Sequence, residues 1–205
     1  MKLQLAVDRL TFAQLDEIVE ECKACVDVIE VGTSFIKEYG VSCVKKIKEK
    51  YPEITLLADI KTIDEAQYEF FMYYEAGADI LTVMGSASLD TIRIARQEAK
   101  RYGKAYCIDL MELDEERVKA LTIFDDAIFC IHVAKDCGVG ISTQLQKVRS
   151  LLPENVCCAA AGSITLSDVA SLKEAGISFM IVGSAIIHAD DRKAAALRFK
   201  EVGRS

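Results

Sequence analysis

Eight short apolar runs recur along the chain, and polar segments with helical periodicity separate them. The runs are rich in Val, Ile, Leu and Ala, and they end at Asp8, Gly32, Lys61, Gly85, Leu110, Val133, Gly162 and Gly183. Strands that are apolar on both faces are typical of parallel sheets, in which right-handed helical crossovers join one strand to the next. The sequence therefore predicts eight successive β-α units.

Eight such units within 205 residues predict an α/β fold, a (β/α)₈ TIM barrel forming one domain over residues 1–205. A doubly wound open sheet is the structural rival, but its GxGxxG fingerprint is absent after the first run, where the chain reads AVDRL. The expected helix N-caps are Thr11, Thr33 or Ser34, Ser88, Asp114 and Ser167. Gly77 and Gly176 are expected to end helices.

Composition argues against several classes of partner. The net charge is -7, so neither nucleic acid nor an anionic membrane is expected to bind. No apolar run approaches the roughly 20 residues of a membrane span, and residues 1–10 do not resemble a signal peptide. We therefore expect a cytoplasmic protein whose eight cysteines remain thiols.

Two cysteine pairs deserve separate interpretation. Cys22 and Cys25 form a CxxC, but their surroundings are helical and no second pair follows, so a zinc site is not expected. Cys157 and Cys158 are adjacent in a predicted strand and must point to opposite faces. Both pairs are interpreted as packing residues.

Polar residues occur where the predicted strands end, which is where barrel enzymes carry their active sites. These ends carry Asp8, Glu30, Asp59, Lys61, Asp109 and His132. Each has a structural interpretation: Asp8 or Asp109 could cap a helix, and His132 could be a hydrogen-bonded core histidine. Their recurrence at corresponding strand ends favours a catalytic site.

The segment LADIKTID concentrates charge at one of these ends. Asp59 and Lys61 are two residues apart, hence on one face of a strand, and Asp64 lies on the loop beyond. Flanking carboxylates keep a lysine protonated, although a rim salt bridge would show the same pattern. Glu30 and Asp59, from neighbouring strands, could share a divalent cation such as Mg²⁺.

Glycine-serine pairs end the last two runs, in AAGSI and VGSAI. Loops after the seventh and eighth strands commonly form the phosphate site of a barrel, because glycine allows close backbone approach and amides at a helix start favour an anion. We therefore predict that Gly162, Ser163, Gly183 and Ser184 bind a phosphate monoester.

Over essentially its whole length the sequence resembles the orotidine 5′-monophosphate decarboxylase superfamily, in its branch of 3-hexulose-6-phosphate synthases and 3-keto-L-gulonate-6-phosphate decarboxylases. The resemblance rests on MKLQLAVD, IEVGTSFI, EAGADILTVMG, IDLM, IHVAKD, VGSAIIHADD and, most specifically, the DxKxxD of Asp59, Lys61 and Asp64. It implies that Glu30 and Asp59 hold Mg²⁺, that Lys61 assists an enediolate through its charge, and that His132 transfers protons. It also implies a homodimer, with Asp64 reaching the partner's site.

Two reactions share that intermediate in the branch. Asp109 and Ser184 resemble the synthase, because the decarboxylase has glutamate and arginine at these places, whereas Lys135 resembles the decarboxylase. We therefore expect a 3-hexulose-6-phosphate synthase that adds formaldehyde to ribulose 5-phosphate, with the decarboxylase as the alternative.

The chain also departs from the synthase pattern at two places. It lacks the glycine of the synthase's HxGxD motif after His132 and has Glu65 and Ala66 in place of small residues. A non-catalytic barrel that binds a sugar phosphate is therefore a second alternative.

Overall fold

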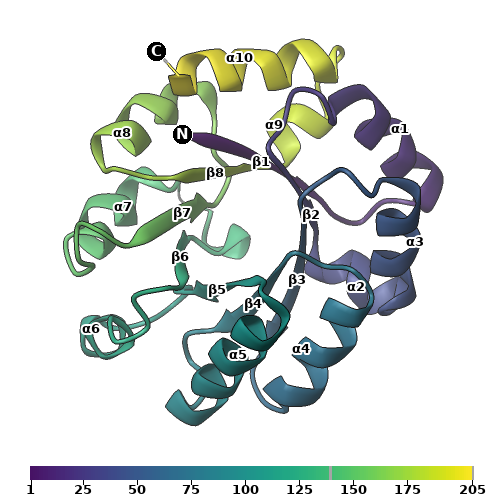
Figure 1. Ribbon diagram of the computed structural model, residues 1–205. Helices are drawn as coiled ribbons and strands as arrows, with labels where there is room; N and C mark the ends of the chain where they lie inside the picture. The colour runs from purple at the N-terminus through teal and green to yellow at the C-terminus, as the bar shows by residue number, and fades with distance from the viewer. Residues whose placement is uncertain (139, 205) are drawn as a thin grey trace.

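The computed structural model confirms the predicted (β/α)₈ barrel (Figure 1). It describes residues 1–138 and 140–204, except for the side chains of Lys135 and Thr143. Eight parallel strands pair in chain order, and β1 closes the barrel against β8. The strands are β1 (Lys2–Val7), β2 (Val28–Val31), β3 (Leu56–Thr62), β4 (Ile80–Met84), β5 (Ala105–Asp109), β6 (Ile128–His132), β7 (Cys157–Ala161) and β8 (Phe179–Val182).

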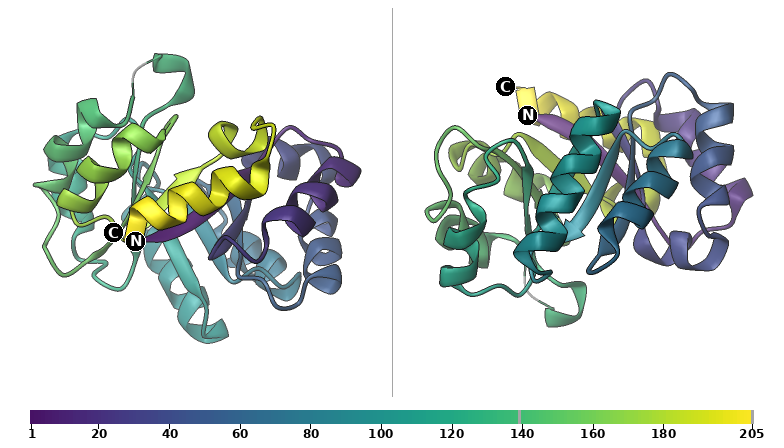
Figure 2. Two further views of the ribbon diagram at one scale, coloured as in Figure 1. Left: turned by 90° about the horizontal axis from the view of Figure 1, so that it is seen from above. Right: turned by 60° about the horizontal axis from the view of Figure 1, so that its bottom comes forward.

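Helices surround this ring of strands, as Figure 1 shows. The α-helices are α1 (Phe12–Cys22), α2 (Thr33–Tyr39), α3 (Ser42–Lys50), α4 (Ala66–Glu75), α5 (Leu89–Tyr102), α6 (Glu115–Leu121), α7 (Ser142–Arg149), α8 (Val169–Glu174), α9 (Ser184–Ile187) and α10 (Arg192–Arg204). Two short 3₁₀ helices are η1 (Lys135–Cys137) and η2 (Leu166–Asp168). In Figure 2 α10 runs beside β1, and the amino group of Met1 donates a hydrogen bond to the carbonyl of Gly203.

The hydrophobic core has two parts, one on each side of the strands. The larger part fills the space between the barrel and its helices. The smaller part lies inside the barrel and consists of Val28, Leu57, Ile80, Cys107, Cys130, Ala159, Ala161 and Phe179. Because successive side chains alternate between the two faces of a strand, each strand serves both parts, which explains why the runs are almost continuously apolar.

The interior face changes from apolar to polar toward the carboxyl ends of the strands. On β2, Val28 lies inside the barrel and Glu30 is the next inward residue; on β5, Cys107 is followed in the same way by Asp109. In the same way, Asp59 is the next inward residue after Leu57 on β3, and His132 is the next inward residue after Cys130 on β6. The strand period of two therefore places the charged side chains together above an apolar floor.

Three predicted N-caps are confirmed, since Thr11, Ser88 and Asp114 each accept a hydrogen bond from an amide in the first helical turn. The predicted start of η2 and α8 at Ser167 is wrong. Thr165 is the cap, and it forms a capping box with Asp168. Gly77 and Gly176 have positive φ angles and end helices as predicted.

The predicted cap of α2 at Thr33 or Ser34 is also wrong. Gly32 occupies the cap position, and Asp8, from the end of β1, accepts a hydrogen bond of 2.8 Å from the amide of Phe35. A Cβ at Gly32 would lie 2.5 Å from Cβ of Asp8, so glycine permits this approach. A side chain from another strand has replaced the local cap.

All eight cysteines are free thiols. Cys22 and Cys25 are buried in the outer core, Cys22 as the last residue of α1. Cys158 also belongs to the outer core, whereas Cys157 packs against the interior part, which confirms that they point to opposite faces. No helix in the described part of the chain is both long and apolar enough to span a membrane.

Candidate active site

A cavity of about 660 Å³ opens at the carboxyl ends of the strands. Of the residues predicted from the sequence to form the site, those that line it are Asp8, Glu30, Asp59, Lys61, His132, Gly162, Ser163, Gly183 and Ser184. Asp109 lies just beneath, lining a space of about 30 Å³ that Glu30, Asp59, Lys61 and His132 also border. The fold thus brings these residues to one place.

Lys61 lies at the centre of the charged cluster. Its Nζ is 2.9 Å from Oδ2 of Asp59 and 3.0 Å from Oδ2 of Asp109. Burial alone would lower the pKa of Lys61, but the two carboxylates outweigh it and raise the pKa. The lysine therefore stays protonated between the two carboxylates.

His132 and Asp109 form a second pair within the cluster. Nδ1 of His132 is 2.8 Å from Oδ2 of Asp109, whose Oδ1 accepts a hydrogen bond from the amide of Met111. Burial opposes both charges, yet His132 and Lys61 lower the pKa of Asp109 to about 2. Burial likewise opposes protonation of His132, but Asp109 raises its pKa. The carboxylate therefore fixes the imidazole through Nδ1 and leaves Nε2 for proton transfer.

Glu30 is another buried carboxylate of the site, and it accepts a hydrogen bond of 2.5 Å from Nε2 of Gln4. Burial and the neighbouring charge of Asp59 raise the pKa of Glu30. Among the described residues, no three His, Cys, Asp or Glu side chains form a metal-binding group. Mg²⁺ nevertheless needs only one or two protein carboxylates, and the repulsion between Glu30 and Asp59 is what a divalent cation would relieve.

The two predicted phosphate loops line the same cavity. Gly162 has a φ of +126°, and a Cβ there would lie 2.9 Å from the carbonyl oxygen of Val133, so only glycine fits. Gly183 precedes α9, where the amides of Ser184 and Ala185 lie in the first turn and have no partner within the helix. Both loops are therefore compatible with anion binding.

Backbone strain is concentrated at this end of the barrel. Within residues 1–138 and 140–204, five non-glycine residues have positive φ, and all lie in or after odd-numbered strands: Arg9, Lys61, Glu65, Glu112 and Ser163. Such conformations cost about 1–3 kcal/mol each and are common at functional sites. The strain coincides with the cavity at Arg9, Lys61 and Ser163, which line it.

Asp64 does not join the cluster within one chain. It is exposed, its Oδ1 accepts a hydrogen bond from the amide of Glu65, and it does not line the cavity. Glu65 is exposed and precedes α4, which Ala66 begins. The side chain of Lys135, which resembles the decarboxylase, lies outside what the structure describes.

Several residues of the site carried no sequence signal that we recognised. Gln4, Thr33 and Thr82 hold the buried carboxylates, and they are uncharged residues within runs that read as ordinary strand or helix start. Arg9 lines the cavity next to the predicted Asp8. The sequence does offer a signal for Arg9. In AVDRL it directly follows Asp8, and none of the other acidic residues at the predicted strand ends is followed by a basic residue.

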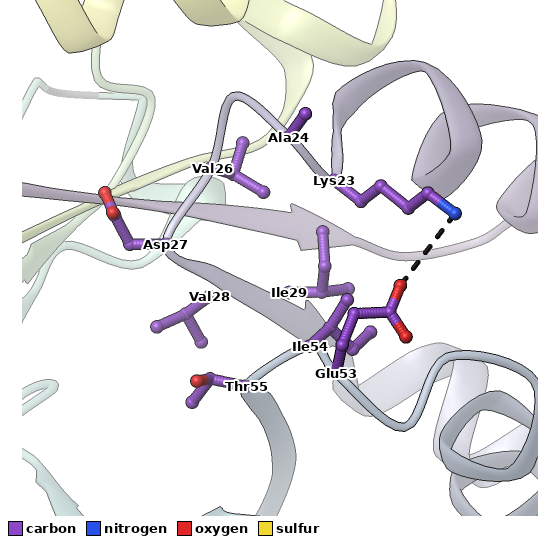
Figure 3. Close-up of a pocket in the computed structure, with 9 residues that line it drawn as sticks. All are labelled: Lys23, Ala24, Val26, Asp27, Val28, Ile29, Glu53, Ile54 and Thr55. Atoms are coloured by element: carbon purple, nitrogen blue, oxygen red, sulfur yellow. Dashed lines mark ion pairs between the residues drawn. The ribbon is translucent and has the colours of Figure 1, made fainter.

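Another cavity, of about 330 Å³, lies at the opposite end of the barrel, beside the start of β2 (Figure 3). Its wall includes Val28, Ile29 and Ile54, and an ion pair of 3.8 Å joins Lys23 to Glu53 at one side. It contains none of the charged residues of the cluster around Lys61. We therefore assign the candidate active site to the carboxyl-end cavity.

The chain is similar to known proteins along almost its whole length. A sequence model described as orotidine 5′-phosphate decarboxylase / HUMPS family matches residues 1–199. A 3-hexulose-6-phosphate synthase of Bacillus subtilis (strain 168) is 32% identical over 207 residues, covering 98% of each chain. The crystal structure of a 3-hexulose-6-phosphate synthase from Salmonella typhimurium has a TM-score of 0.94 and 34% identity, covering 100% of this chain and 99% of that one. A 3-keto-L-gulonate-6-phosphate decarboxylase from Vibrio cholerae shares the fold, with a TM-score of 0.84 and 23% identity over 99% of this chain and 97% of that one.

Proposed function

The chain belongs to the orotidine 5′-phosphate decarboxylase / HUMPS family, and on that premise we propose that it is a 3-hexulose-6-phosphate synthase. The proposed reaction removes a proton from C1 of ribulose 5-phosphate and adds the resulting enediolate to formaldehyde, giving a hexulose 6-phosphate. The enzyme would thus be an aldehyde-lyase that also catalyses the reverse cleavage. One observation carries the proposal: Glu30, Asp59, Lys61, Asp109 and His132 converge beside two glycine-serine loops.

His132 is the proposed base. With Nδ1 held by Asp109, its Nε2 accepts the C1 proton, and Asp109 stabilises the imidazolium that forms. The enediolate carbon then attacks formaldehyde, and the imidazolium returns the proton to the new alkoxide oxygen. His132 ends the cycle neutral, so the reaction needs no external acid.

Lys61 provides fixed positive charge next to the developing enediolate. Its ammonium already lies between Asp59 and Asp109, so it requires little reorganisation when negative charge forms on the substrate. The raised pKa means that Lys61 acts as a charge and hydrogen-bond donor rather than as a base. This division of roles leaves proton transfer to His132.

Glu30 and Asp59 would hold the Mg²⁺ ion of the proposed enzyme. Bound there, the ion would supply positive charge to the oxygens of the substrate. The chain's own contribution is to keep both carboxylates in place through Gln4, Thr33 and Thr82. The buried pair fits a divalent cation because the cation would offset the burial and the charge of Asp59 that raise the pKa of Glu30.

Gly162, Ser163, Gly183 and Ser184 are the proposed phosphate-binding residues. Backbone amides and the two hydroxyls offer neutral donors, so a further positive charge is expected near a dianionic phosphate. Arg9 meets this need, because it follows β1, which pairs with the end of β8 just before Gly183, and it lines the same cavity. No ion pair of Arg9 occurs among the described side chains.

We also propose that the active enzyme is a homodimer in which Asp64 completes the site of the partner. Asp64 is exposed beside Ile63, and Tyr68 and Phe71 follow on α4; these three apolar side chains are 54%, 63% and 44% exposed. An exposed apolar patch of this kind is characteristic of an interaction surface. It would carry Asp64 into the contact between subunits.

The activity is tested by incubating the protein with Mg²⁺, ribulose 5-phosphate and formaldehyde while following the loss of formaldehyde. Lys61→Ala should reduce kcat at least about 100-fold, because a charge placed for the transition state is removed. Lys45→Ala is the matched control, since Lys45 is exposed on α3, away from the cavity. Both variants should show the far-ultraviolet circular dichroism of the wild type.

The same assay separates the alternatives. No formaldehyde loss, together with CO₂ release from 3-keto-L-gulonate 6-phosphate, would replace the proposal with the decarboxylase. Binding of ribulose 5-phosphate without turnover of either substrate would identify a non-catalytic sugar-phosphate binder. Full activity of Lys61→Ala would contradict the role given to that lysine.

A further inference from the structure

β3 is irregular in the segment that contains Asp59 and Lys61. Its register against β4 shifts between Ala58 and Thr62, and Lys61 adopts a φ of +48°, in the left-handed region. A lysine in that region is strained, so contacts around it must hold it there. From this position the ammonium of Lys61 contacts the carboxylates of both Asp59 and Asp109.

One hydroxyl group connects the two residues. Oγ1 of Thr82, on β4, accepts a hydrogen bond of 2.9 Å from the amide of Lys61. The same oxygen donates a hydrogen bond of 2.8 Å to Oδ1 of Asp59, and this contact is buried. Thr82 thereby links the strained backbone of one functional residue to the carboxylate of another.

We propose that Thr82 is a positioning residue that sets the orientation of Asp59 and the left-handed conformation of Lys61. It borders the small space beneath the charged cluster and does not line the wide cavity, so it acts through these two residues rather than on substrate. The inference deepens the proposed function and relies on it for its kinetic readout.

The chemistry of the contact restricts which side chain can replace Thr82. A hydroxyl offers one donor and accepting lone pairs on a single atom, and both kinds of bond are used here. Valine has the same shape but neither function, so it leaves the Lys61 amide and Asp59 Oδ1 each without one partner. Serine keeps both functions and loses only a methyl group.

A purely structural role for Thr82 is the competing explanation, and Thr91 provides the control for it. Thr91 is also a buried threonine, and its hydroxyl is hydrogen-bonded to that of Ser88 at the start of α5. It contacts none of the charged residues of the site. Thr91→Val therefore removes a buried hydroxyl without disturbing Asp59 or Lys61.

The experiment compares Thr82→Val, Thr82→Ser and Thr91→Val in three measurements. These are kcat and KM with ribulose 5-phosphate and formaldehyde, Mn²⁺ affinity by electron paramagnetic resonance, and crystal structures of the variants. Thr82→Val should lower kcat and weaken Mn²⁺ binding by about 10–100-fold each, as expected when a partner of a metal ligand is lost. Its crystal structure should show a rotated Asp59 carboxylate or Lys61 outside the left-handed region.

Thr82→Ser should restore kcat and Mn²⁺ affinity to within about threefold of the wild type, and Thr91→Val should change stability alone. The inference is overturned if Thr82→Val keeps Asp59 and Lys61 in place, or if it loses stability without losing Mn²⁺ affinity. A wild type without turnover counts against the proposed reaction instead, and the crystal structures still decide the role of Thr82.

Discussion

At the scale of single residues, the neighbouring charges decide whether burial raises or fails to raise the pKa of each carboxylate in the site. Asp109 is ionised because His132 and Lys61 surround it, whereas burial and the charge of Asp59 favour protonation of Glu30. Both carboxylates follow an inward-facing apolar residue of their strand, but their charged partners differ. His132 derives its basicity from Asp109 in the same way.

This pairing predicts a pH dependence. His132 must be neutral to accept a proton, and its raised pKa moves the acidic limb of kcat/KM above the usual histidine value of about 6.5. Asp109→Asn removes the stabilising charge, so the limb should move to lower pH and kcat should fall. Rates measured from pH 5 to 9 test this; a limb that stays in place in Asp109→Asn would exclude His132 as the titrating base.

At the scale of elements, a partly buried charge connects several segments at the end of the barrel away from the site. Asp79 precedes β4 and accepts hydrogen bonds from Lys48, Lys104 and the amide of Leu56. These contacts connect α3, the start of β3 and the start of β5. Burial alone would raise the pKa of Asp79, but its lysine partners and the amide lower it.

Asp79→Asn should therefore lower the free energy of unfolding by about 2 kcal/mol at pH 7. Because the folded-state pKa lies below the unfolded value of about 3.9, this contribution is present above that pH and is lost as the pH falls through the folded-state pKa. The difference between variant and wild type should shrink below about pH 4 in urea titrations. Asp90→Asn is the control, because Asp90 forms an exposed ion pair with Arg93, and it should change the free energy of unfolding by less than about 0.5 kcal/mol. A destabilisation by Asp79→Asn that does not depend on pH would contradict this account.

At the scale of the whole molecule, one surface of the barrel fits the proposed dimer. The β3–α4 loop and α4 expose Ile63, Tyr68 and Phe71 around Asp64, and α4 packs beside α5, where Ile94 is also exposed. The loop begins directly beyond Lys61, so a contact at this face would connect subunit association to the active site.

Tyr68→Glu combined with Phe71→Glu should convert a dimer into monomers and reduce kcat at least about tenfold, because charge is introduced into an apolar contact and Asp64 of the partner is lost. Ile123→Glu is the matched control: Ile123 is 54% exposed and lies after α6, away from this face. Light scattering after size exclusion gives the mass. A wild type that is monomeric and fully active would exclude the shared site.

The barrel itself was predictable because its signal is local and repeated. Eight apolar runs of strand length, each followed by a helical segment, determine the number of units, and the period of two determines which residues face inward. The convergence of strand-end residues followed from that geometry, and the structure places Asp8, Glu30, Asp59, Lys61, Asp109 and His132 around the mouth of one barrel.

What the sequence by itself determined was therefore the set of strands and the positions of their polar ends, since both follow from periodicity along a single segment. Only the tertiary structure decided which groups hold one another. Thr82 and Asp59 form a hydrogen bond although 23 positions separate them in the sequence, and Lys61 and Asp109 form one across 48 positions. At the start of α2, Asp8 rather than Thr33 accepts the hydrogen bond from the first helical turn. Such contacts depend on the distances between different strands, and a threonine or glutamine in a strand gives no sign in the sequence of the partner it will have in the fold.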